Sequence, residues 1–140
     1  MPTLRLIADD LTGTLDTAAG LTGLCGTVPV AWPGILPDRA SGSLAVDAGT
    51  RERAAAEAAR IAGGLAPLLD GADIAFRKLD SLLRGPWAAE LAATFKVGAW
   101  RRCIVAPASP VQGRVTVEGR PPARRADGWL PVSGDLAPAD

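Results

Sequence analysis

The sequence contains no histidine, and only two of its 140 residues are cysteines. Histidine is the usual general base and the commonest metal ligand in proteins. Its absence argues against a serine–histidine hydrolase and against a zinc enzyme. Cys25 and Cys103 lie far apart in apolar stretches, so we expect free buried thiols rather than a disulfide.

The chain also lacks an excess of charge and any long apolar run. Fifteen basic and fifteen acidic side chains cancel, which removes the positive surface typical of nucleic-acid binders. No apolar run approaches the roughly 20 residues of a membrane span. Residues 3–8 have the pattern of a strand and not of a signal peptide. We therefore expect a cytoplasmic protein without nucleic-acid or membrane partners.

What is present is an alternation of strand and helix patterns, on a scale that fits one domain. The expected strands are 4–8, 27–32, 43–47, 74–79 and 102–106, and the expected helices are 15–24 (capped near Asp16), 52–69 and 87–95. Strands that alternate with helices are joined by right-handed crossovers. The sequence therefore predicts an α/β fold, Rossmann-like and three-layered: a mostly parallel open sheet of about five strands with helices on both faces.

The richest polar stretch is residues 78–85 (KLDSLLRG), which joins an expected strand to an expected helix. Turns of this kind meet at the carboxyl ends of parallel strands, where ligands bind. The topology collects further polar side chains from other strand ends at the same rim. The candidate site residues are Asp9, Asp10, Thr12, Arg51, Lys78, Asp80, Ser81, Arg84 and Arg114.

Carboxylates, hydroxyls and cations in one place suit a small polyhydroxylated anion. Arg84 or Arg114 can hold a carboxylate through two parallel hydrogen bonds. Asp9, Asp10 and Asp80 can accept hydrogen bonds from sugar hydroxyls. The sequence has no Walker loop and no dinucleotide glycine motif. It therefore shows no place for nucleotide phosphates, and we expect no metal site.

Residues 8–13 (ADDLTG), 78–85 (KLDSLLRG) and 106–119 (APASPVQGRVTVEG) form three ordered motifs, to which Asp47 and Arg51 add a strand-end motif. Together they resemble the N-terminal, substrate-binding domain of the four-carbon acid sugar kinases. The resemblance implies a small anionic sugar acid as ligand: threonate, erythronate or a 3-oxo-tetronate. It also implies ATP and Mg²⁺ as cofactors, which in the family belong to a second, C-terminal domain that we do not find in this chain.

The resemblance implies an acid-sugar-binding domain over residues 1–119, shorter than the family's usual first domain. We expect the Pro- and Arg-rich tail, residues 120–140, to be loop or poorly ordered. Four positions depart from the family pattern: Leu82, Pro86, Ser109 and Val115. We therefore expect a truncated or divergent member that is inactive alone, associates with itself and needs a separate ATP-binding domain or chain.

Two alternatives remain open at this point. In the first alternative, the chain is a non-catalytic ligand-binding remnant or a subunit of a split kinase, and it has no catalytic residue of its own. In the other alternative, residues 10–15 (DLTGTL) resemble the nucleophile motif of haloacid-dehalogenase-type phosphotransferases. Asp10 would then be the phosphorylated nucleophile, Thr14 would bind phosphate and Lys78 would balance charge, while Asp135 imitates the family's acidic metal-binding motif.

Overall fold

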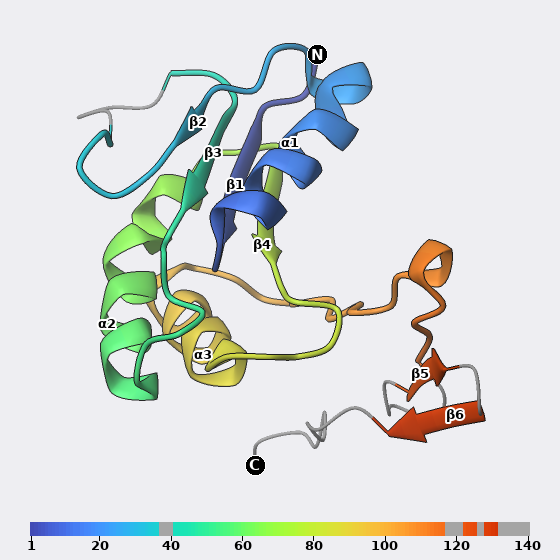
Figure 1. The fold of residues 1–140 in the computed structure, drawn as a ribbon. Coiled ribbons are helices and arrows are strands. Elements are labelled where there is room, and N and C mark those ends of the chain that lie inside the picture. Colours follow the sequence, from blue (N-terminus) through green and yellow to red (C-terminus); the bar gives the residue numbers. More distant parts are fainter. Residues whose placement is uncertain (37–40, 117–121, 126–127, 132–140) are drawn as a thin grey trace.

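The computed structural model describes residues 1–36, 41–116, 122–125 and 128–131. Its centre is a four-stranded parallel sheet in the order β2-β3-β1-β4 (Figure 1). The strands are β1 (Leu4–Ala8), β2 (Val30–Ala31), β3 (Leu44–Asp47) and β4 (Ile74–Lys78). The predicted parallel α/β sheet is confirmed. Because its strands are parallel, the carboxyl ends of β1, β3 and β4 lie at one edge.

Helices cover both faces of the sheet, which gives the predicted three layers (Figure 1). One face carries α1 (Leu11–Cys25). The other carries α2 (Ala55–Leu65), the short 3₁₀ helix η1 (Ala66–Leu69) and α3 (Trp87–Val97), with α2 and α3 packed together. The turns that precede α1, α2 and α3 are therefore all positioned by the same sheet edge.

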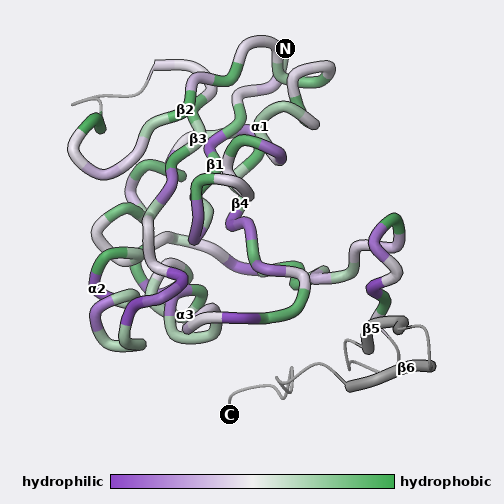
Figure 2. The backbone as a smooth tube through the Cα atoms, viewed as in Figure 1, coloured by the Kyte–Doolittle hydropathy of each residue, from purple (hydrophilic) through white to green (hydrophobic). Residues whose placement is uncertain are grey.

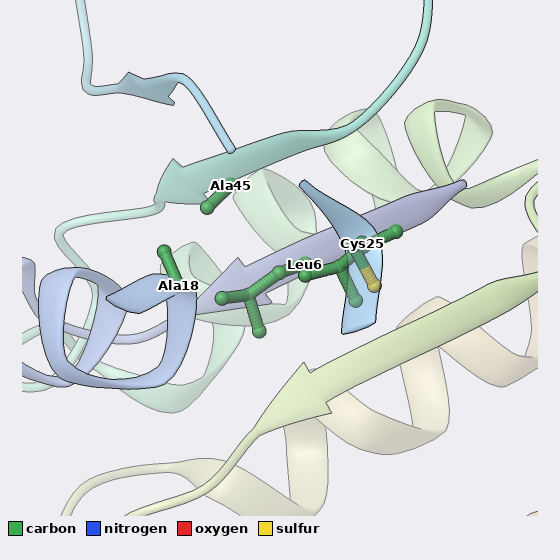
Figure 3. Packing of buried hydrophobic residues seen from close by; sticks show 5 residues of the cluster. Leu6, Ala18, Cys25 and Ala45 are labelled. Carbon is green, nitrogen blue, oxygen red and sulfur yellow. The ribbon is translucent and has the colours of Figure 1, made fainter. Parts of the chain in front are cut away.

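Successive strand residues point to opposite faces and so build two halves of the core. Leu6 and Ala45 pack against Ala18 and Cys25 beneath α1 (Figure 3). Ile7, the next residue of β1, belongs to the cluster on the side of α2 and η1. Burying one large aliphatic side chain in this way stabilises the fold by about 1.5–3 kcal/mol.

Helix α1 begins four residues earlier than the sequence predicted, at Leu11 rather than Leu15. Asp10 is the N-cap, and its Oδ1 accepts a hydrogen bond from the Gly13 N–H at 3.1 Å. Asp16, the predicted cap, lies inside the helix. Because the first turn of α1 is polar, the apolar periodicity does not show where the helix begins. The cap, Asp10, is also one of the predicted site residues.

Residues 102–106 do not form the predicted fifth strand. Ile104 in this segment is 93% exposed, and no strand pairing involves the segment in the described part of the chain. A β-prone sequence becomes a strand only where its side chains pack on a sheet, and here they face solvent. The predicted buried Cys103 is accordingly exposed, although both cysteines are free as expected.

The tail, which was expected to be loop or poorly ordered, contains an antiparallel pair of strands, β5 (Pro122–Arg125) and β6 (Gly128–Pro131). The pair lies apart from the main sheet, beyond the short helix η2 (Pro110–Gln112) (Figure 1). The other tail residues, Asp135 among them, lie outside the described residues. Within the described ranges, no helix combines the length and the apolar character needed to cross a membrane.

Candidate functional site

A cavity of about 1040 Å³ opens at the carboxyl ends of β1 and β4 and continues along β4 toward α3 and residues 102–109. Eight of the nine predicted site residues line it: Asp10, Thr12, Arg51, Lys78, Asp80, Ser81, Arg84 and Arg114. Asp9 does not line it and is only 3% exposed. Hydrophilic and hydrophobic residues alternate along the segment that follows β4 (Figure 2). Because eight of the predicted rim residues line this cavity, the rim is concave.

Arg51, which follows β3, clamps two carboxylates at the end of β1. Its Nε and Nη2 donate to Asp9 at 2.9 Å, and its Nη1 and Nη2 donate to Asp10 at 2.7 and 2.9 Å. The hydrogen bonds with Asp9 raise the pKa of Arg51 above its ordinary value. Asp9 thus supports Arg51, while Asp10, with 27% of its side chain exposed, reaches the cavity. Both Asp10 oxygens accept hydrogen bonds: Oδ1 from the Gly13 N–H and from Arg51 Nη2, and Oδ2 from Arg51 Nη1.

The turn after β4 is organised by Asp80. Its Oδ2 accepts hydrogen bonds from the backbone N–H of Leu82 and Arg84, and Nε and Nη2 of Arg84 donate to its two oxygens at 2.8 and 2.9 Å. Burial alone would raise the pKa of Asp80, but the hydrogen bonds and charge of Arg84, with the charge of Arg51, lower it to about 2. Asp80 is therefore ionised at neutral pH. Arg84, which is paired with it, also lines the cavity.

The same turn contains two residues in the left-handed region of backbone conformation. Leu83 has a φ of 54° and its side chain is buried, and Gly85 has a φ of 77°. A left-handed conformation is unfavourable for a residue with a Cβ. A Cβ on Gly85 would also lie 2.8 Å from the carbonyl oxygen of Arg51. The turn is thus strained at Leu83 and in close backbone contact with the turn after β3.

Two further cations reach the cavity with few partners. Lys78 Nζ donates to the carbonyl of Leu79 at 2.6 Å. Arg114 Nη1 donates to Ser81 Oγ and to the side chain of Gln112. Arg114 thereby brings the segment after α3 against the 78–85 turn. Lys78, Arg84 and Arg114 all line the cavity, and Thr12 lies exposed on its wall in the first turn of α1.

Asp47 adds a fourth carboxylate at the end of β3. Burial raises its pKa, the Gly49 N–H at 2.8 Å partly offsets that effect, and the charges of Asp10 and Asp9 raise it further. Arg51 relieves this crowding of acids by lying among them. In the part of the chain that the structure describes, no group of three or more histidine, cysteine or acidic side chains is placed to hold a metal ion.

A buried polar cluster behind the rim is not predicted from the sequence. Glu90 of α3 is 1% exposed; its Oε1 accepts a hydrogen bond from Thr50 Oγ1 and lies 2.6 Å from Arg77 Nη2. Arg77 and Glu90 fall within an expected strand and an expected helix, both of which are recognised by their apolar residues. The sequence signal that could have indicated a buried Glu90 was its position between Ala89 and Leu91, as a lone carboxylate on an otherwise apolar helix.

The sequence matches the profile of the sugar-binding N-terminal domain over residues 4–126. The chain belongs to this family. Curated relatives are the D-threonate kinases of Bordetella bronchiseptica, 35% identical over 84% of this chain, and of Cupriavidus necator, 38% identical over 81%. The D-threonate kinase of Salmonella typhimurium is 30% identical over 82% of the chain. The predicted relationship to the N-terminal domain of the four-carbon acid sugar kinases is confirmed.

Solved relatives of this sugar-binding domain have the same fold. A domain of unknown function from Bordetella bronchiseptica, crystallised with bound citrate as a domain-swapped dimer, has a TM-score of 0.75 and 31% identity over 99% of this chain and 37% of its own. A second crystal form gives a TM-score of 0.67 and 32% identity, over 86% of this chain and 32% of the relative. The chain spans 28–31% of the length of the curated D-threonate kinases.

Proposed function

We propose that the chain binds a four-carbon acid sugar such as D-threonate and supplies the substrate side of an ATP-dependent kinase. The observation that carries this proposal is the cavity at the strand ends, which Lys78, Arg84 and Arg114 line together with Asp10 and Ser81. A tetronate has one carboxylate and several hydroxyl groups, which match these cations and acceptors. The D-threonate kinase activity of the relatives supports the same class of ligand.

Within this proposal, Arg84 holds the carboxylate of the ligand. Asp80 orients the guanidinium through Nε and Nη2, and 59% of the Arg84 side chain remains exposed. Asp10 and Ser81 then accept hydrogen bonds from the hydroxyls. The solved relative was crystallised with bound citrate, which is itself a hydroxy acid.

We further propose that ATP and Mg²⁺ belong to a second domain or chain and meet the sugar acid at the open side of the cavity. The residues of this chain do not fit a nucleotide, because the sequence has no glycine-rich phosphate loop. The role of this domain is therefore to bind and orient the hydroxyl that accepts the phosphoryl group. Since ATP is the donor, we expect the reaction to occur in the cytoplasm.

Calorimetric titration with D-threonate tests the proposed ligand. We expect saturable binding at one site per chain and no binding of threitol, which carries the hydroxyls without the carboxylate. Equal heats for D-threonate and threitol, or no heat for any tetronate isomer, would contradict the proposal.

We also propose that the chain forms a homo-oligomer, as its solved relatives do. Light scattering on the purified chain should give a dimer or a larger mass. A monomeric mass at high protein concentration would count against it.

A further inference from the structure

Glu90 lies at the start of α3, immediately after the 78–85 turn, yet its carboxylate contacts a different turn. The Glu90 N–H donates to the carbonyl of Pro86 at 3.1 Å, which fixes the residue relative to that turn. Its Oε1 accepts the hydroxyl hydrogen of Thr50, which is fully buried after β3. Glu90 therefore joins the turn after β4 to the turn after β3.

The second contact of Glu90 compensates a buried charge. Arg77 Nη2 lies 2.6 Å from Glu90 Oε1, and only 5% of the Arg77 side chain is exposed. Among the described residues, Arg77 Nε and Nη1 have no hydrogen-bond partner. An uncompensated buried charge is strongly unfavourable. Arg77 therefore holds the Glu90 side chain in its place.

Thr50 connects Glu90 to the carboxylate clamp. The backbone N–H groups of Thr50 and Arg51 both donate to the carbonyl of Asp9, at 3.0 and 3.1 Å. The Arg51 guanidinium then donates to the carboxylates of Asp9 and Asp10. One continuous set of hydrogen bonds thus runs from the interior carboxylate of Glu90 to Asp10 on the cavity wall.

We infer that Glu90 is a positioning residue for the ligand site: it holds Thr50, and through Thr50 it sets Arg51, which presents Asp10 to the cavity. The effect on ligand affinity rests on the proposed function, whereas the effect on Arg51 does not. Gly85 reinforces the arrangement, because its lack of a Cβ lets its turn approach the Arg51 carbonyl. Residues that never touch the ligand would then control its affinity.

Hydrogen exchange of the Arg51 Nε–H, followed by NMR, tests the inference without any ligand. In Thr50→Val, which removes the hydroxyl and keeps the shape, we expect exchange to be at least about tenfold faster. Thr50→Ser, which keeps the hydroxyl, should exchange at close to the wild-type rate. The Nε–H of Arg84 is the comparison within the same chain: its partner Asp80 lies 3.8 Å from Arg51 Nη2 and makes no hydrogen bond with it, so its exchange should change much less than that of Arg51. Unchanged Arg51 exchange in folded Thr50→Val would overturn the inference.

A second pair of variants isolates the carboxylate. Glu90→Gln alone would leave Arg77 uncompensated and risks unfolding, so Arg77→Met is combined with it. The double variant Arg77→Met/Glu90→Gln keeps an acceptor for Thr50, and its Arg51 exchange should stay close to wild type. Arg77→Met/Glu90→Leu has a similar volume but no acceptor, and its Arg51 exchange should be at least about tenfold faster. Equal Arg51 exchange in the two double variants would overturn the role of Glu90.

D-Threonate titration of the same variants separates this inference from the proposed function. We expect Thr50→Val to bind at least about fivefold more weakly than Thr50→Ser. If D-threonate binds and its affinity is equal in both, the positioning of the ligand site by Glu90 is wrong and the proposed function stands. If the wild type does not bind but Arg51 exchange responds as expected, the proposed function fails and the structural role of Glu90 stands.

Discussion

The two arginines nearest the rim differ in how many of their donors are already used. Arg51 donates to two carboxylates and 17% of its side chain is exposed. Among the residues that the structure describes, the Arg84 side chain donates only to Asp80, and 59% of it is exposed. Both arginines belong to the motifs found in the sequence, which do not show that their contacts differ. Arg51 holds the carboxylates of Asp9 and Asp10 in place, whereas Arg84 remains available to a ligand.

Replacing Arg84 should therefore weaken ligand binding without unfolding the domain. Loss of a charge-assisted contact to a carboxylate typically costs about 2–5 kcal/mol, so Arg84→Ala should lower the D-threonate affinity at least about tenfold. Arg53→Ala is the matched control, because Arg53 is exposed and, within the described ranges, its one ion pair is with Glu57. Calorimetry on both variants checks this. Equal affinities for Arg84→Ala and wild type would remove Arg84 from the site.

Asp80 should make stability depend on pH in the acid range. Its pKa is about 2 in the folded chain against an ordinary value of 3.8, so its stabilising contribution is present above about pH 4 and is lost as the pH falls toward 2. Allowing for the exposure of Arg84, this contribution is about 1–2 kcal/mol. Urea unfolding at several pH values should show a smaller acid-induced loss in Asp80→Asn than in wild type. Identical pH profiles would contradict the assignment.

At the scale of elements, the turn between β4 and α3 has little freedom to change its backbone. Gly85→Ala would place a side chain at a φ of 77° and 2.8 Å from the Arg51 carbonyl. We expect it to lower the free energy of unfolding by about 2 kcal/mol or more. Gly64→Ala is the control: Gly64 lies within α2, and a Cβ there would meet nothing within 4 Å, so alanine should stabilise by about 0.5–1 kcal/mol. Chemical denaturation measures both, and a neutral Gly85→Ala would show that the turn relaxes.

The sequence predicted the elements best where apolar periodicity is strong. The predicted strands over 4–8, 43–47 and 74–79 match β1, β3 and β4 to within one residue. The start of α1 was missed because its first turn is polar, and residues 102–106 were misassigned because a β-prone pattern does not ensure packing. Glu90 was missed because its partner Thr50 is 40 residues away, and only the crossover brings the two together.

At the scale of the whole molecule, the site is assembled from the segments after β1, β3 and β4, which the parallel sheet brings to one edge, and from a fourth segment, which contains Arg114 and follows no strand of that sheet. That convergence follows from topology, so it could be predicted from the order of strands and helices. The pairing of charges could not, because the same acids and cations allow several combinations. The structure pairs Arg51 with Asp9 and Asp10, and Arg84 with Asp80.

This chain alone should show no ATP-dependent kinase activity, because in the proposed function the nucleotide is held elsewhere. Purified protein incubated with ATP, Mg²⁺ and a panel of threonate and erythronate isomers should release no ADP above background. A full-length D-threonate kinase assayed in parallel serves as the positive control. Steady, substrate-dependent ADP release by this chain would show that it binds nucleotide itself.

The left-handed Leu83 also limits how this pocket can be re-engineered. A β-branched residue at position 83 would be strongly disfavoured at a φ of 54°, and a polar one would place its side chain in the core. Saturation libraries that vary positions 79–86 together would therefore discard most members for misfolding. Diversification for other hydroxy acids should be directed to Ser81, which lines the cavity in the same turn and does not have a left-handed backbone conformation.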